Sequence, residues 1–382
     1  MKKLYWKPTK TSWHIHVVIA IVAVLCISSV EIFKIKIKKP YYQEKIKAAQ
    51  LMDTALKTLK KYRLDQKVFP IDPEVDPLES GMIGMLISPI TSNAGVREAK
   101  LATVNPNWAA VMVDLLERAG VKNGDTIATG FSGSFPSLNT AVLCAAQVMN
   151  LKVVAISSAS ASTWGANIPE FSWLDMERIL NENKIISNRS VAASFGGSQD
   201  RATGMSKEGR EMLRAIIANN SVELIFEKDE QANLNKRMAI YNEKSGDAPI
   251  KAFVNVGGGT VSVGTRIGKE LFKPGLNKDP GMEELAIDSV MSRFAREGVP
   301  VIHMTKVNAL AQKYGIPFEF TTIPRPGEGA LFSSYVYNRY IVAVALLIIF
   351  AMLIFLIKMG YGGRLFSFES AKKDKSGSEP MV

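Results

Sequence analysis

The chain has 382 residues and a formal net charge of +11 at pH 7, with 47 Lys and Arg against 36 Asp and Glu. Cysteines occur only at positions 26 and 144, both within apolar patterns, which excludes a disulfide-stapled fold. The basic residues gather at the two ends: residues 1–39 hold eight against one acidic residue, and residues 336–382 hold six against three. A nucleic-acid-binding domain carries its basic residues on its own folded surface, so this distribution excludes nucleic acid as a partner.

The first predicted element is a transmembrane helix over residues 13–33. Residues 11–30 contain no Lys, Arg, Asp or Glu, and at about 1.5 Å per residue they span the roughly 30 Å hydrocarbon core of a bilayer. The basic residues 1–12 would also suit a signal peptide. No cleavage site of small residues follows, so the sequence favours an uncleaved anchor with a basic cytoplasmic N-terminus.

A helix is predicted next over residues 40–66, which we interpret as a stalk leaving the bilayer. Prolines at 70, 73 and 77 cannot continue it and mark a boundary. Residues 80–330 then alternate short apolar runs with helical patterns, which is typical of an α/β fold with a largely parallel, doubly wound sheet, in one domain or two subdomains. Strands are predicted over 125–129, 151–157, 190–194, 222–226, 251–256 and 299–304, and helices over 106–119, 136–149, 173–182, 206–219, 229–244, 284–297 and 306–314.

A second transmembrane helix is predicted over residues 338–358, because residues 340–357 are apolar almost throughout. Basic residues follow this span more densely than they precede it, which places the basic tail 359–382 in the cytoplasm. We expect that tail to be disordered. Since two spans return the N-terminus to the same side, the sequence predicts a two-pass protein of the inner or plasma membrane with an extracytoplasmic central domain and two cytoplasmic termini.

Three loops rich in glycine and serine follow predicted strands, at the sheet edge where α/β proteins bind ligands. The loop at residues 130–135 leads into a helix at Pro136, and its N–H groups and hydroxyls suit an oxyanion. The glycines of the loop at residues 194–206 lead into a helix that begins near Ser206. The loop at residues 255–264 has three successive glycines, which allow close approach to a ligand. Tight turns that bind nothing are the alternative for the loops at 130–135 and 255–264. The predicted ligand-binding residues are Gly130, Ser132, Gly133, Ser134, Gly257, Gly258 and Gly259.

The first loop is also close to the nucleophile elbow G-x-S-x-G, although Ser134 stands where the second glycine belongs. His303 ends a predicted strand and would lie at the same sheet edge, where Asp200 could orient its ring. Ser132, Asp200 and His303 are therefore a candidate catalytic triad. The alternative is that His303 is a structural residue with hydrogen bonds of its own.

The sequence predicts no cofactor and no metal site. Its glycines match neither the dinucleotide fingerprint G-x-G-x-x-G nor a P-loop, which needs G-K-[ST]. His14 and His16 lie at the start of the first apolar run with no third ligand nearby, so we expect them at the membrane interface.

Three segments between the two anchors carry a family resemblance: NAGVREAKLATVNPNWAAVMVDLLERAGVKNGD, GFSGSFPSLNTAVLCAAQ and VNVGGGTVSVG. Together with the anchors, they make the chain resemble the bacterial poly-gamma-glutamate system protein family over nearly its whole length. The resemblance implies association with the membrane-embedded machinery that makes or exports poly-gamma-glutamate, alongside an ATP-dependent ligase and a small membrane partner. It assigns no catalytic residues.

Three functions remain open at this point. The first is a membrane-anchored accessory subunit, not the ligase, that holds or guides the anionic polymer or its partner subunits outside the membrane. The second is a serine hydrolase or transferase that acts on the polymer through Ser132 and His303. The third is a binding or sensory protein for a small anion.

Overall fold

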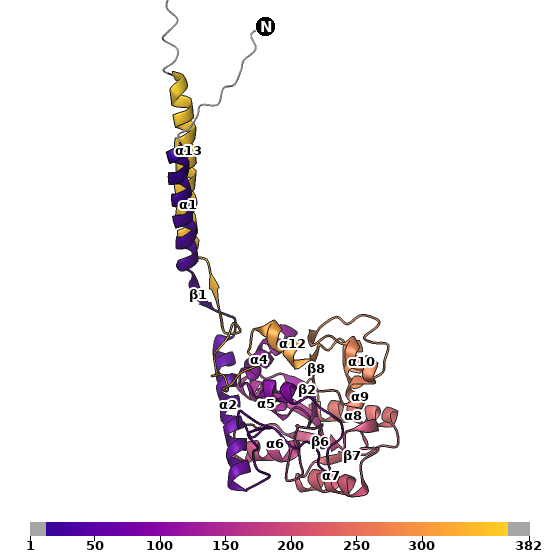
Figure 1. The fold of residues 1–382 in the computed structure, drawn as a ribbon. Coiled ribbons are helices and arrows are strands. Elements are labelled where there is room, and N and C mark those ends of the chain that lie inside the picture. The colour runs from indigo at the N-terminus through magenta and orange to yellow at the C-terminus, as the bar shows by residue number, and fades with distance from the viewer. Residues whose placement is uncertain (1–12, 366–382) are drawn as a thin grey trace, which may run out of the picture. The chain divides into compact units, whose positions relative to one another are not determined.

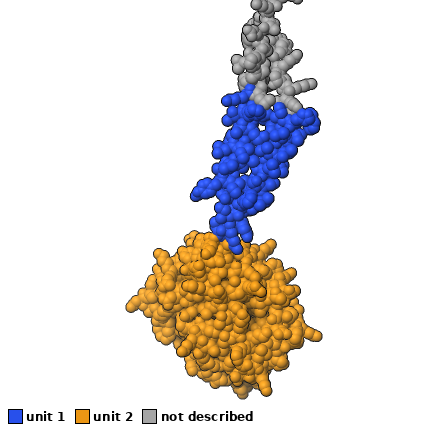
Figure 2. All heavy atoms as spheres, turned by 90° about the vertical axis from the view of Figure 1, so that its left-hand side faces the viewer, with its two compact units in different colours: residues 1–37, 334–382 blue, residues 38–333 orange. Residues whose placement is uncertain are grey.

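The computed structural model describes residues 13–365, which fall into two compact units (Figure 2). One unit contains the described residues up to Ile37 and from Ser334 onward, and the other contains Lys38–Ser333. The region predicted as α/β is therefore a single unit and not two subdomains.

Two apolar helices form most of the first unit. α1 (Trp13–Ile32) and α13 (Arg339–Leu365) contact each other, and both are long and apolar enough to cross a membrane. The adjoining strands β1 (Ile35–Lys38) and β11 (Ser333–Val336) pair as a two-stranded sheet. α13 continues as a helix through residues 359–365, the first part of the predicted disordered tail. The rest of that tail, 366–382, and the predicted N-terminus, 1–12, lie outside the described residues.

A seven-stranded sheet forms the centre of the second unit (Figure 1). All its neighbouring strands are parallel except β9, which runs antiparallel to β10. This confirms the α/β class and the six predicted strands. β9 was not predicted because it contains a single apolar side chain, Leu276, and no apolar run. In spatial order the strands are β7 (Glu223–Ile225), β6 (Ser190–Ser194), β3 (Lys152–Ser158), β2 (Thr126–Ser132), β8 (Ile250–Val256), β10 (Val301–Met304) and β9 (Gly275–Asn277).

The longer helices of this unit form where the sequence predicts them, except that α11 is shorter. A capping box at Ser289, in which its side chain and that of Ser292 each accept the other's backbone N–H, starts α11 at the next residue. The predicted helices are α4 (Trp108–Ala119), α5 (Pro136–Val148), α6 (Trp173–Glu182), α7 (Lys207–Asn219), α8 (Glu230–Ser245), α11 (Val290–Arg296) and α12 (Val307–Tyr314). Short elements complete the unit: α3 (Arg97–Leu101), η1 (Ala102–Val104), β4 (Asn167–Ile168), β5 (Phe171–Ser172), η2 (Ser198–Asp200), α9 (Thr260–Val263) and α10 (Arg266–Leu271).

The predicted stalk helix exists as α2 (Tyr42–Asp65), but it is part of the α/β unit (Figure 1). It packs against α4 and α5 and buries Met52 and Leu59 completely. The buried Arg63 guanidinium donates to backbone carbonyls of the following loop, including those of Gly81 and Ile83, both at 2.8 Å. The stalk interpretation is wrong, because the apolar stripe that it would expose to water is instead covered by the domain.

The core contains two hydrophobic clusters built from alternate residues of the same strands. Ile127 and Val153 belong to the larger cluster, with residues of α2, α4, α5 and α6. Ala128 and Val154 belong to the smaller one, with residues of α8 and α11. Because successive side chains of a strand point to opposite faces, both faces of the sheet bury apolar side chains.

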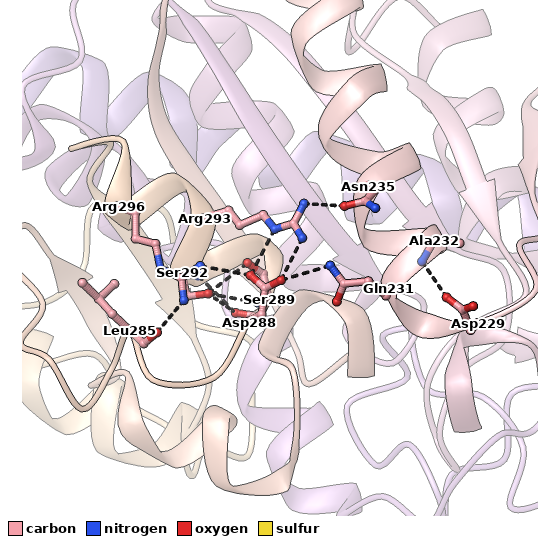
Figure 3. Close-up of polar contacts among 10 residues, drawn as sticks. All are labelled: Asp229, Gln231, Ala232, Asn235, Leu285, Asp288, Ser289, Ser292, Arg293 and Arg296. Carbon is pink, nitrogen blue, oxygen red and sulfur yellow. Dashed lines mark hydrogen bonds and ion pairs between the residues drawn. The ribbon is translucent and has the colours of Figure 1, made fainter.

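α8 and α11 are held together by a polar cluster around Asp288 (Figure 3). The Asp288 carboxylate accepts hydrogen bonds from Arg293 at 2.7 Å, Arg296 at 3.0 Å and Gln231 at 3.2 Å. Arg293 also donates to Asn235 of α8 at 2.8 Å. Chiefly through the Arg293 hydrogen bond, these partners hold the pKa of Asp288 well below its usual range. The cluster fixes α8, which carries the buried Arg237, against its neighbour.

Candidate functional site

The strand order reverses at the centre of the sheet, between β2 and β8. From β2 the chain builds outward through β3, β6 and β7, and then returns to place β8 on the other side of β2. In open parallel sheets, the loops after the two strands at such a point diverge and leave a crevice at the carboxyl edge, where ligands bind. A cavity of about 480 Å³ opens at this edge. We call it the central pocket.

The central pocket combines the three predicted loops with segments that sequence reasoning did not assign to a site. Ser132 and Ser134 of the first loop line it, as do Gly196 and Gly197 of the second and all three glycines at 257–259 of the third. Most of the other lining residues come from α3 and the segment before it, from the loops after β3 and β10, and from α10. They include Ser158, Ser160, Ser162, Lys100, Lys269, Glu270 and Lys306.

Two of the predicted ligand-binding glycines serve packing instead. Gly130 lies inside β2, where an added Cβ would come within 3.2 Å of the Phe253 ring and of Ser262 Oγ. At Gly133 an added Cβ would lie 2.8 Å from the Ser160 carbonyl oxygen, closer than real Cβ contacts come. Neither glycine lines the central pocket, so glycine at these positions allows the close approach of neighbouring chain segments.

Lys100 is the most strongly perturbed charged group of the central pocket. Its side chain is buried, and Nζ donates to the carbonyl oxygen of Ser134 and to Ser162 Oγ, the latter at 3.0 Å. Nζ also lies 3.6 Å from the centroid of the Phe135 ring. No carboxylate lies within ion-pair distance of it in residues 13–365. Burial, and then the nearby charge of Lys269, lower the pKa of Lys100 to about 7.

The remaining charges of the central pocket leave it rich in cations. Glu270 pairs with Lys306 at 2.6 Å and so neutralises it. Lys269 lies against Gly258, where an added Cβ would come within 3.3 Å of its Nζ, and within the described part of the chain it has no ion-pair partner. Two lysines that lack a carboxylate thus face one cavity, an arrangement that an anion would stabilise.

A buried hydroxyl without a hydrogen-bond partner also lines the central pocket. Ser160 is 2% exposed, and within residues 13–365 its Oγ has no hydrogen-bond partner. Leaving such a group unsatisfied in the interior costs about 1–3 kcal/mol, so a ligand in the cavity that paired with it would recover that cost. In the described structure, the backbone N–H groups of Gly258 and Gly259 also have no acceptor. The site therefore offers neutral donors as well as lysines.

The proposed Ser132–Asp200–His303 triad is not assembled in this structure, because Asp200 is fully engaged elsewhere. It is buried, and its carboxylate accepts from Arg237 at 2.6 Å, Ser194 at 2.7 Å and Asn233 at 2.9 Å. Ser132 and Asp200 both line a small cavity of about 20 Å³, but that cavity does not include His303. Asp200 is thus the centre of a structural network.

His303 has hydrogen bonds of its own, as the alternative interpretation expects. Its Nδ1 lies 3.0 Å from Asn255 Nδ2, the residue beside it in the β8–β10 register, and its Nε2 lies 3.3 Å from the Lys269 carbonyl oxygen. Burial lowers the pKa of His303 to about 4. Both ring nitrogens face groups other than Ser132, so this histidine is not placed to act as that serine's base.

A larger cavity of about 660 Å³ lies at the opposite edge of the sheet, before β8 and β10. It is lined by loop residues that include Gly246, Asp247, Gly298 and Pro300. This is the amino edge of the strands, away from the loops that diverge at the switch point. The candidate site is therefore the smaller central pocket. No family model, curated protein or solved structure matches this chain.

Proposed function

We propose that the chain is a membrane-anchored accessory protein whose central pocket binds a carboxylate-bearing polymer, poly-gamma-glutamate. One observation carries the proposal. The same cavity contains two lysines without a carboxylate partner and the unsatisfied hydroxyl of Ser160. Carboxylate oxygens accept from ammonium, hydroxyl and N–H groups alike. The identity of the polymer comes from the sequence resemblance, and we assign no ligase activity.

The balance of charge suits reversible binding of a long anion. With one of its three lysines neutralised by Glu270, the pocket offers a few strong contacts and not a broad basic surface. A polymer with one carboxylate per residue can then be held at one unit and released as it moves. We infer that the role is to hold or guide the chain, in company with membrane-embedded synthesis subunits.

We further infer that the sheet is doubly wound, and that the α/β unit faces outward from an inner or plasma membrane. The first inference is supported by the two hydrophobic clusters, which take alternate residues of the same strands. The second is supported by the two apolar helices and by the basic residues that follow the second of them.

Polymer binding tests the proposal directly. Full-length protein in lipid nanodiscs should bind poly-gamma-glutamate at low ionic strength. Lys269→Met should weaken this binding at least tenfold, because a hydrogen bond to a charged group contributes about 1.5–3 kcal/mol. Ser160→Ala should weaken it about fivefold. Calorimetric titration measures both. Lys207→Met is the matched control, because it removes the same charge from an exposed site on α7.

Three results would contradict the proposal. Equal weakening by Lys269→Met and Lys207→Met would mean that the polymer senses only net charge. Binding of free glutamate with the same affinity as the polymer would favour a small-anion sensor. Absence of polymer binding at low ionic strength would remove the proposal altogether.

The outward orientation predicts that a cysteine on the α/β surface reacts in intact cells. Lys207→Cys places a thiol where the native side chain is 86% exposed. A membrane-impermeant maleimide should label it without permeabilisation. The two native cysteines are buried, and burial raises the pKa of the Cys144 thiol, so the wild type serves as the unlabelled control. Labelling only after permeabilisation would reverse the orientation.

A further inference from the structure

We propose that Ser162 and Lys100 form a nucleophile–base pair that cleaves an amide bond of a carboxylate-bearing substrate in the central pocket. The inference rests on the proposed function for its substrate class, the amide-linked glutamate polymer, and on geometry for its chemistry. Lys100 Nζ lies 3.0 Å from Ser162 Oγ, within the distance needed for direct proton transfer. Both residues line the central pocket.

The surroundings of Lys100 are those of a base and not of an ion-pair partner. The amine is enclosed by the Ser134 carbonyl, the Phe135 ring and Ser162, with no carboxylate at ion-pair distance in the described residues. The charged groups facing it across the pocket are Lys269 and the paired Glu270 and Lys306. Burial in this setting brings the pKa of Lys100 to about 7, so near neutral pH half of the amine has a free electron pair for the Ser162 proton.

Ser162 is the one serine lining the central pocket whose hydroxyl bonds to a titratable side chain in the described structure. Ser132 Oγ accepts from the Ser134 N–H at 3.2 Å, and Ser134 Oγ accepts from the Ser162 N–H at 2.9 Å. Ser158 Oγ lies 3.4 Å from the Ser160 carbonyl. A serine hydroxyl is a weak nucleophile without an adjacent base, so these three lack what Ser162 has.

The Gly95 backbone packs closely beside the Ser162 hydroxyl. A Cβ added to Gly95 would lie 2.8 Å from Ser162 Oγ, closer than real Cβ contacts come. The Gly95 loop is fixed in place by Thr163, whose Oγ1 accepts from the Gly95 N–H at 2.6 Å. Glycine at this position therefore lets the loop pack against Ser162 without displacing its hydroxyl from Lys100.

The reaction balances with these groups and water alone. Ser162 Oγ bonds to the amide carbon while its proton moves to the neutral Lys100 Nζ. The groups of the same pocket that would stabilise the negative oxygen are the N–H groups of Gly258 and Gly259 and the Lys269 ammonium. The C–N bond then breaks, and the leaving amine takes the proton from Lys100. Water attacks the resulting ester and gives its proton to Lys100, which returns it to Ser162 Oγ as the carboxylic acid leaves.

Covalent labelling tests the pair without requiring the natural substrate. Full-length protein in detergent is treated with a fluorophosphonate, which forms a P–O bond to an activated serine and releases fluoride. Mass spectrometry of the digest should place a single adduct on Ser162, and Ser162→Ala should abolish it. Lys100→Met should slow labelling at least 100-fold, and the wild-type rate should rise with pH through about 7. The exposed Ser187 is the control serine, since Ser187→Ala should leave the rate unchanged.

The outcomes separate the pair from the binding proposal. The pair would be overturned by any of three results: no adduct, an adduct on another serine, or equal labelling of Lys100→Met and wild type. Cooperative unfolding of each variant in urea, as for the wild type, shows that the variant is folded. A Ser162 adduct without polymer binding would support the pair and reject the proposed ligand. Shortening of poly-gamma-glutamate that is lost in Ser162→Ala is expected; a Ser162 adduct with no shortening would overturn the substrate class.

Discussion

Replacing Arg237 with Met is expected to destabilise the α/β unit by about 3–5 kcal/mol, the range for breaking a buried ion pair from one side. Arg237 and Asp200 have side chains that are each 4% exposed, and Arg237 also donates to Ser194 and Asn233. Without the guanidinium, the Asp200 carboxylate is left buried with only neutral donors around it. The loss is large because the Asp200 carboxylate would remain out of contact with water without the ion pair that compensates for its burial.

Urea unfolding of the detergent-solubilised chain measures this loss, with the emission of the fully buried Trp108 and Trp173 as the signal. The adjacent residue supplies a matched control. Lys236 pairs with Glu223 at 2.9 Å, but both side chains are more than 40% exposed. Lys236→Met should therefore change stability by about 0–1 kcal/mol. A loss for Arg237→Met as small as that control would contradict the structural role given to Asp200.

Poly-gamma-glutamate binding is expected to weaken as pH rises, by up to about tenfold per unit above pH 7. In the proposed complex the ammonium form of Lys100 would attract the polymer and the neutral amine would not. The pKa of Lys100 in the free protein is about 7. The polymer carboxylates, with a pKa of about 4, stay ionised over this range. At one pH unit above the pKa, about nine-tenths of the Lys100 side chains are neutral. The affinity should fall in proportion to the charged fraction, down to the level that the other contacts maintain.

Titrations at pH 6, 7 and 8.5 would measure the slope. Lys100→Met should bind more weakly at pH 6 and show little dependence on pH. Lys269→Met should retain the slope but move its midpoint upward, because the charge of Lys269 contributes to lowering the Lys100 pKa. An unchanged slope in Lys100→Met would assign the titration to another group. Serine labelling should have the opposite slope, since it requires the neutral amine.

Much of the fold was predictable because strands and helices of this chain have strong local patterns. Residues 190–194 form a strand with the predicted limits, as an apolar run bounded by polar residues indicates. The stalk prediction failed because it used the apolar periodicity of α2 to predict a helix but did not consider that the apolar face must be buried. A stripe containing Ala48, Met52 and Leu59 needs an apolar partner, and the chain supplies it in α4 and α5.

The candidate site was predictable only in part, for a topological reason. The loops after β2 and β8 could be placed together because the carboxyl ends of parallel strands share one edge. Lys100 and Ser162 lie 62 residues apart and belong to no motif. Their contact depends on the segment before β2 packing beside the loop after β3. The predicted triad failed because strand position does not determine side-chain partners: the register places Asn255 beside His303.

The paired strands β1 and β11 have a consequence for proteolysis. The chain leaves α1 and returns to α13 through these two short segments, which are hydrogen-bonded to each other. A protease that cut only one connection would leave the α/β unit attached through the other. Release of this unit from the two apolar helices would therefore require two cleavages.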